Sequence, residues 1–422
     1  MVNFCIIMIG LLLIINLLVH QKIYSPTNVF IFSFFMLFIF ERLKLYGLYE
    51  ANERSYIVCT IGVTSFAIGC WLMAFLHHAQ YPEDIDSELA DFVIKNTINQ
   101  NRKLLLILFI VACAIEIFYA KDSFSYLRSG GSLYDMRYLM QDELHTSKFL
   151  STLHVYIAVP IFFISLPISV FDLLINNKKS LFLITVLTTT FYFISNGARI
   201  PLIYFAVALF STIFMFTKYI KNKNKLMKIA ILLVGVLIIL NLLTSSRKGN
   251  NVTDSNSFIQ GFYYYVAGSM INLGEKIDFV SYHTSLYGIG TFYGFFAIIY
   301  NFFEVSFINY ASYLMDYIQN DVITVAPSDP FYNFGVTGFL NSYADGKIIG
   351  VISISIILGA ISQIIYFKLL QRQTLKWYIL YSLLVEFMVL YVITDMFSNI
   401  SFTVAIIYTI FLIDDRKIYL DY

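Results

Sequence analysis

Long apolar runs separated by short polar segments form the dominant pattern along this chain. A membrane-spanning helix needs about 20 mainly apolar residues. Runs of this kind predict spans at approximately 3–19, 26–40, 55–76, 104–120, 152–175, 181–195, 200–217, 227–244, 348–367, 377–394 and 398–414. The pattern therefore predicts an all-α fold, a polytopic transmembrane helical bundle of about eleven spans, with residues 1–422 forming a single integral membrane domain.

The positions of lysine and arginine predict the orientation of this bundle. Basic residues in short loops are retained on the cytoplasmic side of a membrane. Three loops are rich in them: 176–179, 218–228 and 368–376. With these loops in the cytoplasm, alternation of the spans places 121–150, 195–199 and 245–347 on the outer side, together with the N-terminus. The C-terminal DDRK segment is then cytoplasmic.

The outer segment 245–347 is about 100 residues long, far beyond an ordinary connection, and loops of that length are usually functional. Within it, residues 286–306 are apolar enough to suggest one more span, but a span there would place two of the basic loops on opposite sides of the membrane. Tyr and Phe rings are well suited to the boundary between lipid and water. We therefore expect a large outer loop that contains interfacial helices.

The composition agrees with lipid as the solvent of this chain. It is 59% hydrophobic and 13% charged, against roughly 45–50% and 25% in soluble domains. A net charge of +1 provides no basic field that would attract nucleic acid, so no nucleic-acid partner is expected. The four cysteines lie in apolar stretches without paired spacing, which predicts neither disulfides nor a metal site. The N-terminus lacks a basic segment and a cleavage site, and we expect a retained first span.

Arg199 is the outer-side residue with the clearest predicted chemistry. The tight turn SNGARIP joins two predicted spans and places Arg199 beside the start of the second, where Pro201 suits the first helical position. A guanidinium beside free backbone N–H groups can bind phosphate or pyrophosphate through paired hydrogen bonds and the helix dipole. The alternative is an arginine that reaches lipid headgroups.

Three further arginines are candidates for the same anion. Arg128 and Arg137 lie in the outer segment 121–150, beside the glycines of RSGGS and before Tyr138, respectively. Arg247 directly follows the predicted span 227–244. Solvation or contact with headgroups is the alternative explanation for each of them.

His283 and Asp329 are the candidates for an acid or base in the large outer loop. Histidine is the side chain that titrates near neutral pH without help, and Asp329 lies in the turn-forming sequence PSDP. A structural histidine and a turn-capping aspartate are the alternatives. No Walker, GxGxxG or HExxH pattern is present, so no cofactor and no metal are expected.

Four sequence elements together give the chain a resemblance to a known family. They are SPTNVF at the start of the second predicted span, RYLMQDE with Arg137, SNGAR with Arg199, and DVITVAPSDPFYNFGVTG before the ninth. With the span pattern and the large loop, they resemble the O-antigen polymerase (Wzy) group of oligosaccharide repeat-unit polymerases, which are multi-pass proteins of the bacterial inner membrane. The family often has Asp-Phe-Gly in the last element, where this chain has Asn333, Phe334 and Gly335.

The resemblance implies a glycosyltransferase that joins undecaprenyl-pyrophosphate-linked repeat units at the periplasmic face and needs no metal. Arg199 and Arg137, with Arg247 and Arg128, would bind the pyrophosphate, while His283 or Asp329 would activate the acceptor hydroxyl. The implied partners are the lipid-linked glycans, the bilayer, a chain-length regulator and a flippase. An O-antigen ligase and a polysaccharide or lipid-linked oligosaccharide transporter are the alternatives. A transporter would be expected to show two related halves, and no repeat is visible.

Overall fold

The computed structural model describes residues 2–18, 22–77, 87–130, 147–196, 200–216, 258–300, 303, 306–320, 323–327 and 335–413. This part of the chain is helical and has no strand beyond an isolated bridge. Five of its helical stretches are long and apolar enough to cross a membrane: Pro26–Leu43, Glu53–Leu76, Arg102–Arg128, Lys148–Leu174 and Phe339–Arg372. The all-α class predicted from the sequence is therefore confirmed, and these five stretches have the length and apolar composition that membrane spans require.

The chain divides into two compact units, and each is built from three separate stretches of sequence. Unit 1 comprises Met1–Pro82, Ile259–Lys368 and Leu384–Thr403, and unit 2 comprises Glu83–Phe258, Leu369–Leu383 and Val404–Tyr422. The long helix α16 (Phe339–Arg372) begins in unit 1, and α17 (Leu375–Leu390) and α18 (Ile400–Leu412) are divided between the units.

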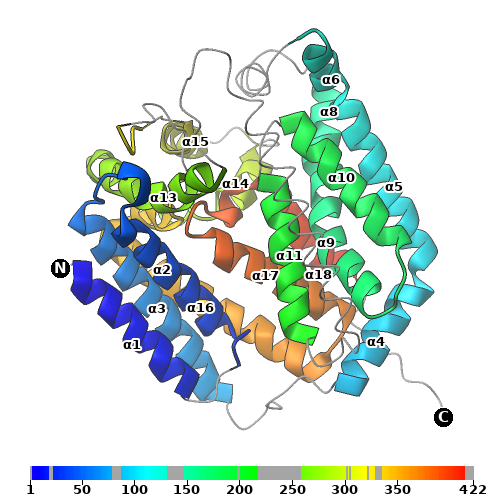
Figure 1. Cartoon of the computed structure of the whole chain (residues 1–422), viewed down its shortest axis with the longest axis horizontal. Helices are drawn as coiled ribbons and strands as arrows, with labels where there is room; N and C mark the ends of the chain where they lie inside the picture. Colours follow the sequence, from blue (N-terminus) through cyan, green and yellow to red (C-terminus); the bar gives the residue numbers. More distant parts are fainter. Residues whose placement is uncertain are drawn as a thin grey trace. The chain divides into compact units, whose positions relative to one another are not determined.

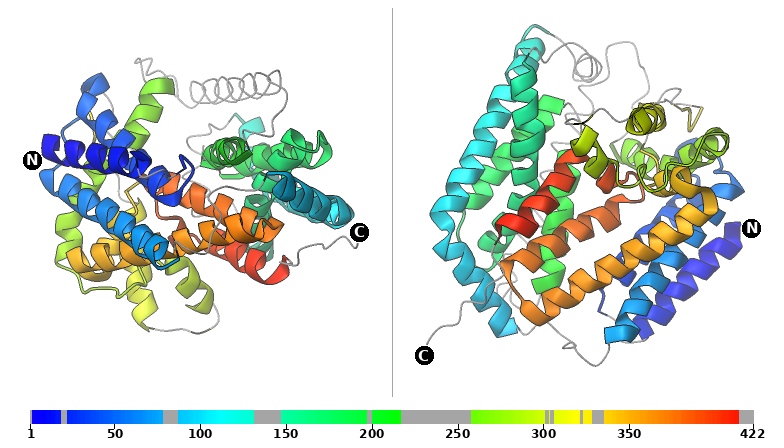
Figure 2. Two further views of the ribbon diagram at one scale, coloured as in Figure 1. Left: turned by 90° about the horizontal axis from the view of Figure 1, so that it is seen from below. Right: turned by 180° about the vertical axis from the view of Figure 1, so that it is seen from behind.

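In unit 1, helices α1 (Val2–Leu18), α2 (Pro26–Leu43) and α3 (Glu53–His77) pack side by side (Figures 1 and 2). Polar side chains connect these helices within the apolar surroundings. The amide oxygen of Asn16 accepts a hydrogen bond from Trp71 Nε1 at 3.0 Å, and its amide nitrogen donates one to Asn28 Oδ1 at 2.5 Å. The unit also contains η1 (Leu45–Gly47), α13 (Phe258–Ser281), α14 (Tyr293–Tyr300), α15 (Ser306–Asn320) and η4 (Met396–Ser398).

Helices α3 and α16 cross closely at two glycines. A Cβ atom on Gly69 would lie 2.2 Å from the carbonyl oxygen of Ile356, and one on Gly359 would lie 2.1 Å from that of Phe66. Small residues at such crossings let helix backbones approach in a membrane, where packing is the main attraction between helices. Nearer its N-terminus, α16 is broken at residues 346–347, where Lys347 has a φ of +55°.

Unit 2 is formed mainly by α5 (Arg102–Tyr119), α9 (Val159–Leu174) and α10 (Ser180–Asn196), which pack on one another. The other helices of this unit are α4 (Ser87–Gln100), α6 (Lys121–Arg128), α8 (Lys148–Leu153), the π-helical turn η2 (His154–Ala158) and α11 (Ile200–Phe216). At one end of the unit, Arg102 at the start of α5 forms two hydrogen bonds to Asp172 near the end of α9, at 3.1 and 2.9 Å. This is the end that the sequence predicts to face the cytoplasm.

Most of the predicted spans coincide with helices. The predicted span 227–244 lies outside the described residues, and the apolar stretch 286–306 contains only the short helix α14 among its described residues. Within the predicted outer loop the structure also has the 24-residue helix α13, which the sequence analysis does not place. The count of about eleven spans, the outer position of 245–347 and the single membrane domain stay predictions.

Candidate functional site

The structure describes two of the six predicted site residues, Arg128 and His283. The other four lie outside the described residues: Arg137, Arg199, Arg247 and Asp329. Arg128 belongs to unit 2 and His283 to unit 1.

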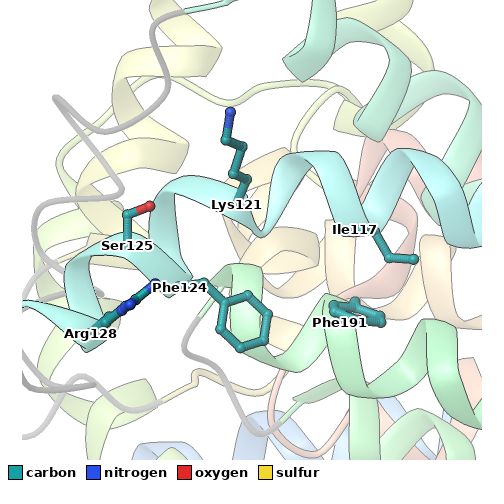
Figure 3. A pocket seen from close by; sticks show the side chains of 6 residues that line it. All are labelled: Ile117, Lys121, Phe124, Ser125, Arg128 and Phe191. Carbon is teal, nitrogen blue, oxygen red and sulfur yellow. The ribbon is translucent and has the colours of Figure 1, made fainter.

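Arg128 lines an open pocket of about 470 Å³ at the junction of α5, α6 and α10 (Figure 3). The lining residues are Ile117, Lys121, Phe124, Ser125, Arg128 and Phe191. Helix α6 continues from α5 after Ala120, so Ile117, Lys121, Phe124 and Arg128 follow one another at the three- and four-residue spacing of one helix face. The rings of Phe124 and Phe191 meet edge to face with centroids 6.0 Å apart.

The pocket combines positive charge with exposed apolar surface. Lys121 and Arg128 are exposed, and neither forms an ion pair with a described residue. Phe124 is 44% exposed and lies between them along the helix. A guanidinium and an ammonium can bind phosphate oxygens, while the neighbouring rings and Ile117 can contact a hydrocarbon chain. This arrangement suits a ligand that is anionic at one end and apolar along its length.

At the same end of unit 2, a buried carboxylate and an imidazole form a close pair. Glu116 on α5 lies with Oε1 2.8 Å from Nδ1 of His154 in η2, and the two side chains are 0% and 8% exposed. The imidazole is held between two phenol rings: Tyr119 stacks on it with centroids 4.0 Å apart, and Tyr192 meets it edge-on at 5.6 Å. Ser195 donates to the other carboxylate oxygen of Glu116 at 3.5 Å.

The π-helical turn that carries His154 has a local cause in the sequence. Pro160 has no N–H to offer the carbonyl of Tyr156, four residues earlier. That carbonyl instead accepts a hydrogen bond from Tyr408 Oη at 2.9 Å. Single π turns inside α-helices occur frequently at functional sites.

The pair and the pocket use neighbouring positions on the same two helices. On α5, Glu116 of the pair precedes Ile117 of the pocket, and on α10 Tyr192 follows Phe191. Ser123 of α6 donates to the carbonyl of Ser195 at 3.4 Å and connects α6 to the end of α10. This end of unit 2 therefore holds a paired histidine and two cations that form no ion pair with a described residue.

His283, at the end of α13 in unit 1, has a different environment. Its Nδ1 lies 2.9 Å from the carbonyl of Phe279, an acceptor, so Nδ1 carries the proton. The Phe279 ring lies against the imidazole, with centroids 4.2 Å apart, and Lys347 donates to the backbone carbonyl of His283 at 2.9 Å. These contacts fix the end of α13. The catalytic role of His283 stays a prediction.

Unit 1 also holds a buried polar network. The carboxylate of Asp345 accepts the backbone N–H groups of Gly290 and Thr291 at 2.7 and 2.9 Å. Asn341, one turn earlier, donates to Asp395 at 3.2 Å. The carboxylates thus fix the 288–292 turn and the break between α17 and α18. Among the residues that the structure describes, no group of three His, Cys, Asp or Glu side chains is placed to hold a metal ion.

The sequence analysis did not single out Glu116, His154 or Lys121. The available signal was an ionisable residue inside an apolar run: Glu116 lies in the predicted span 104–120 and His154 in 152–175. Ionisable residues at membrane depth are costly and usually functional or paired. Both residues lie within predicted spans, whereas the six site residues predicted from the sequence all lie in the outer segments.

Comparison with known proteins gives no match for this chain. No protein-family model matches the chain, and no curated protein or solved structure matches it.

Proposed function

We propose that this protein polymerises undecaprenyl-pyrophosphate-linked oligosaccharide repeat units into O-antigen or a related surface polysaccharide. The reaction is a glycosyl transfer at the periplasmic face of the bacterial inner membrane. The observation that carries the proposal is the pocket of unit 2, in which Lys121 and Arg128 flank the exposed ring of Phe124. A polyprenyl pyrophosphate has the matching properties, a charged head and a long hydrocarbon chain.

The leaving group of the proposed reaction explains why cations are useful there. Breaking the bond between the donor sugar and pyrophosphate leaves negative charge on the phosphate oxygens, and prepositioned positive groups stabilise charge as it develops. Arg199 and Arg137 are the arginines that the sequence predicts for this task. Arg128 and Lys121 extend the same clamp on α6, and no metal is needed for it.

Complementation tests the proposal. The gene is deleted in its host, and the lipopolysaccharide is resolved on a gel after plasmid rescue with the wild type, Arg199→Ala, or the double variant Lys121→Ala/Arg128→Ala. We expect single-repeat cores in the deletion strain, a full ladder with the wild type, and shortened or missing ladders with the variants. Lys148→Ala is the matched control, since this exposed lysine lies at the start of α8 and outside the pocket.

The other outcomes are equally informative. An unchanged ladder in the deletion strain contradicts polymerisation, and bare core points to a ligase or a flippase. If the Lys121→Ala/Arg128→Ala variant is expressed at the wild-type level and still gives a full ladder, the pocket has no role in the reaction.

A further inference from the structure

The Glu116–His154 pair has the geometry of a general base whose proton-accepting atom is free. Because Glu116 accepts at Nδ1, the imidazole is fixed in the tautomer that carries its proton there and leaves the lone pair on Nε2. Nε2 forms no hydrogen bond to any residue that the structure describes. A carboxylate that orients a histidine in this way also stabilises the imidazolium formed when the base accepts a proton.

The surrounding residues hold the imidazole in one orientation. Tyr119 of α5 stacks on one face of the ring, Tyr192 of α10 meets it edge-on, and Ser195 of α10 lies 3.5 Å from the second oxygen of Glu116. Among the described residues, the titratable groups with a recorded contact to the His154 ring are Glu116 and these two tyrosines. Contacts from these two helices hold the ring more closely than packing alone requires.

The pair also adjoins the pocket proposed for the pyrophosphate. Glu116 directly precedes Ile117 of the pocket on α5, and Tyr192 directly follows Phe191 on α10. The Nδ1 atom of His283, in contrast, is engaged by a backbone carbonyl instead of a carboxylate.

We propose that His154, oriented by Glu116, is the general base that activates the acceptor hydroxyl for glycosyl transfer, an inference that rests on the function proposed above. The Nε2 lone pair takes the hydroxyl proton as the hydroxyl oxygen bonds to the anomeric carbon of the donor glycan. The bond from that carbon to the pyrophosphate oxygen breaks, and its electron pair leaves with the lipid pyrophosphate. His154 then releases the proton from Nε2 to water.

The test is the pH dependence of the reaction rate. Purified protein in nanodiscs is supplied with lipid-linked repeat units extracted from the deletion strain, and polymer formation is followed from about pH 5 to 9 across the range in which a histidine titrates. For the wild type we expect the rate to fall at acid pH, because a general base must be unprotonated to accept the hydroxyl proton. His154→Gln should lower the rate by about 10²- to 10⁴-fold and remove this acid limb.

Glu116→Gln separates a catalytic role from a structural one. The carboxylate holds the imidazole in the tautomer that leaves the lone pair on Nε2, and the substitution removes that preference without removing the histidine. The rate at neutral pH should fall roughly 10- to 100-fold, as for other partners that orient a functional histidine. Thr152→Val is the matched control, because this exposed hydroxyl lies two residues before His154 and, among the described residues, bonds only to the carbonyl of Lys148.

Each result decides the question. A wild-type protein that forms no polymer overturns the proposed function and this inference together. An active wild type with an active, correctly eluting His154→Gln variant overturns the inference alone, as does loss of the acid limb in His283→Gln instead. If His154→Gln aggregates, the Glu116→Gln rate decides, and a rate at neutral pH equal to that of the wild type refutes the role of the pair.

Discussion

Replacing Arg102 by leucine tests how unit 2 is held together at the end opposite His154. Arg102 forms a paired contact with Asp172 and a 2.7 Å hydrogen bond to Ser180 at the start of α10. The side chain of Asp172 is 0% exposed and that of Arg102 is 21% exposed. The replacement therefore leaves a buried carboxylate without its cation.

The expected cost follows from this burial. Removing one partner of a buried ion pair costs about 3–5 kcal/mol, and we expect about 3 because Asn176 still donates to Asp172 at 2.9 Å. Asp172→Leu should cost less, about 1 kcal/mol, since the stem of Arg102 can carry its guanidinium to water. The double variant replaces both charges with apolar groups and should lie within about 1 kcal/mol of the wild type. The coupling energy is then about 3 kcal/mol.

Reversible unfolding in mixed micelles, followed by circular dichroism, gives the free energies for this cycle. The matched control is Arg54→Leu, which breaks the ion pair of Arg54 with Asp278, whose side chains are 63% and 57% exposed. Exposed pairs contribute less than about 1 kcal/mol. The reasoning is refuted if Arg102→Leu costs no more than Arg54→Leu, or if the double variant is as unstable as the two single changes added together.

Three further changes have outcomes that the structure determines. Gly359→Val should prevent stable packing of α3 on α16, because its Cβ would lie 2.1 Å from the carbonyl oxygen of Phe66, and monodisperse protein should be lost in size-exclusion chromatography. Asp345→Asn should destabilise by about 1–3 kcal/mol, since the new amide donor faces the N–H groups of the 290–291 turn, and limited proteolysis should detect this turn opening. Glu386→Gln should change stability by less than about 1 kcal/mol in thermal melting. Both oxygens of this buried carboxyl lack partners among the described residues, and burying an unpaired charge costs more than burying a neutral acid, which glutamine resembles.

Each of these has a result that would contradict it. Ile357→Val, on the exposed side of α16, is the control for the glycine, and equal elution of both variants would show that the crossing is loose. An Asp345→Asn protein that resists protease like the wild type would mean that the turn is held by other contacts. A large loss of stability in Glu386→Gln would indicate an ionised carboxylate with a partner.

The helices that could be predicted from the sequence are those that coincide with a continuous apolar run. The runs at 26–40 and 55–76 are continuous and apolar, and they correspond to α2 and α3. Helix α13 was not predicted, because QGFYYYVAGSMINLGEKIDF mixes apolar residues with glycine, amide and charged groups. Such a segment becomes helical through packing in its unit and carries no long apolar run.

The candidate site was harder to predict because it depends on contacts between distant residues. Arg128 was identified from its own loop, and the structure adds Lys121 and the rings beside it. Glu116 and His154 are separated by 38 residues in sequence. Nothing in either local sequence indicates the partner, and only the packing of α5 on η2 brings them together.

Helix α5 sets the distance and angle between two polar contacts, one near each of its ends. Arg102 engages Asp172 at one end and Glu116 engages His154 at the other. At 1.5 Å and 100° per residue, the two positions are about 21 Å apart and within about 40° of the same helix face. One inserted residue between them would rotate one contact by about 100° away from its partner. Evolution can therefore vary the apolar side chains of this helix but not its length, and descendants of this sequence should keep the Arg102-to-Glu116 spacing unchanged.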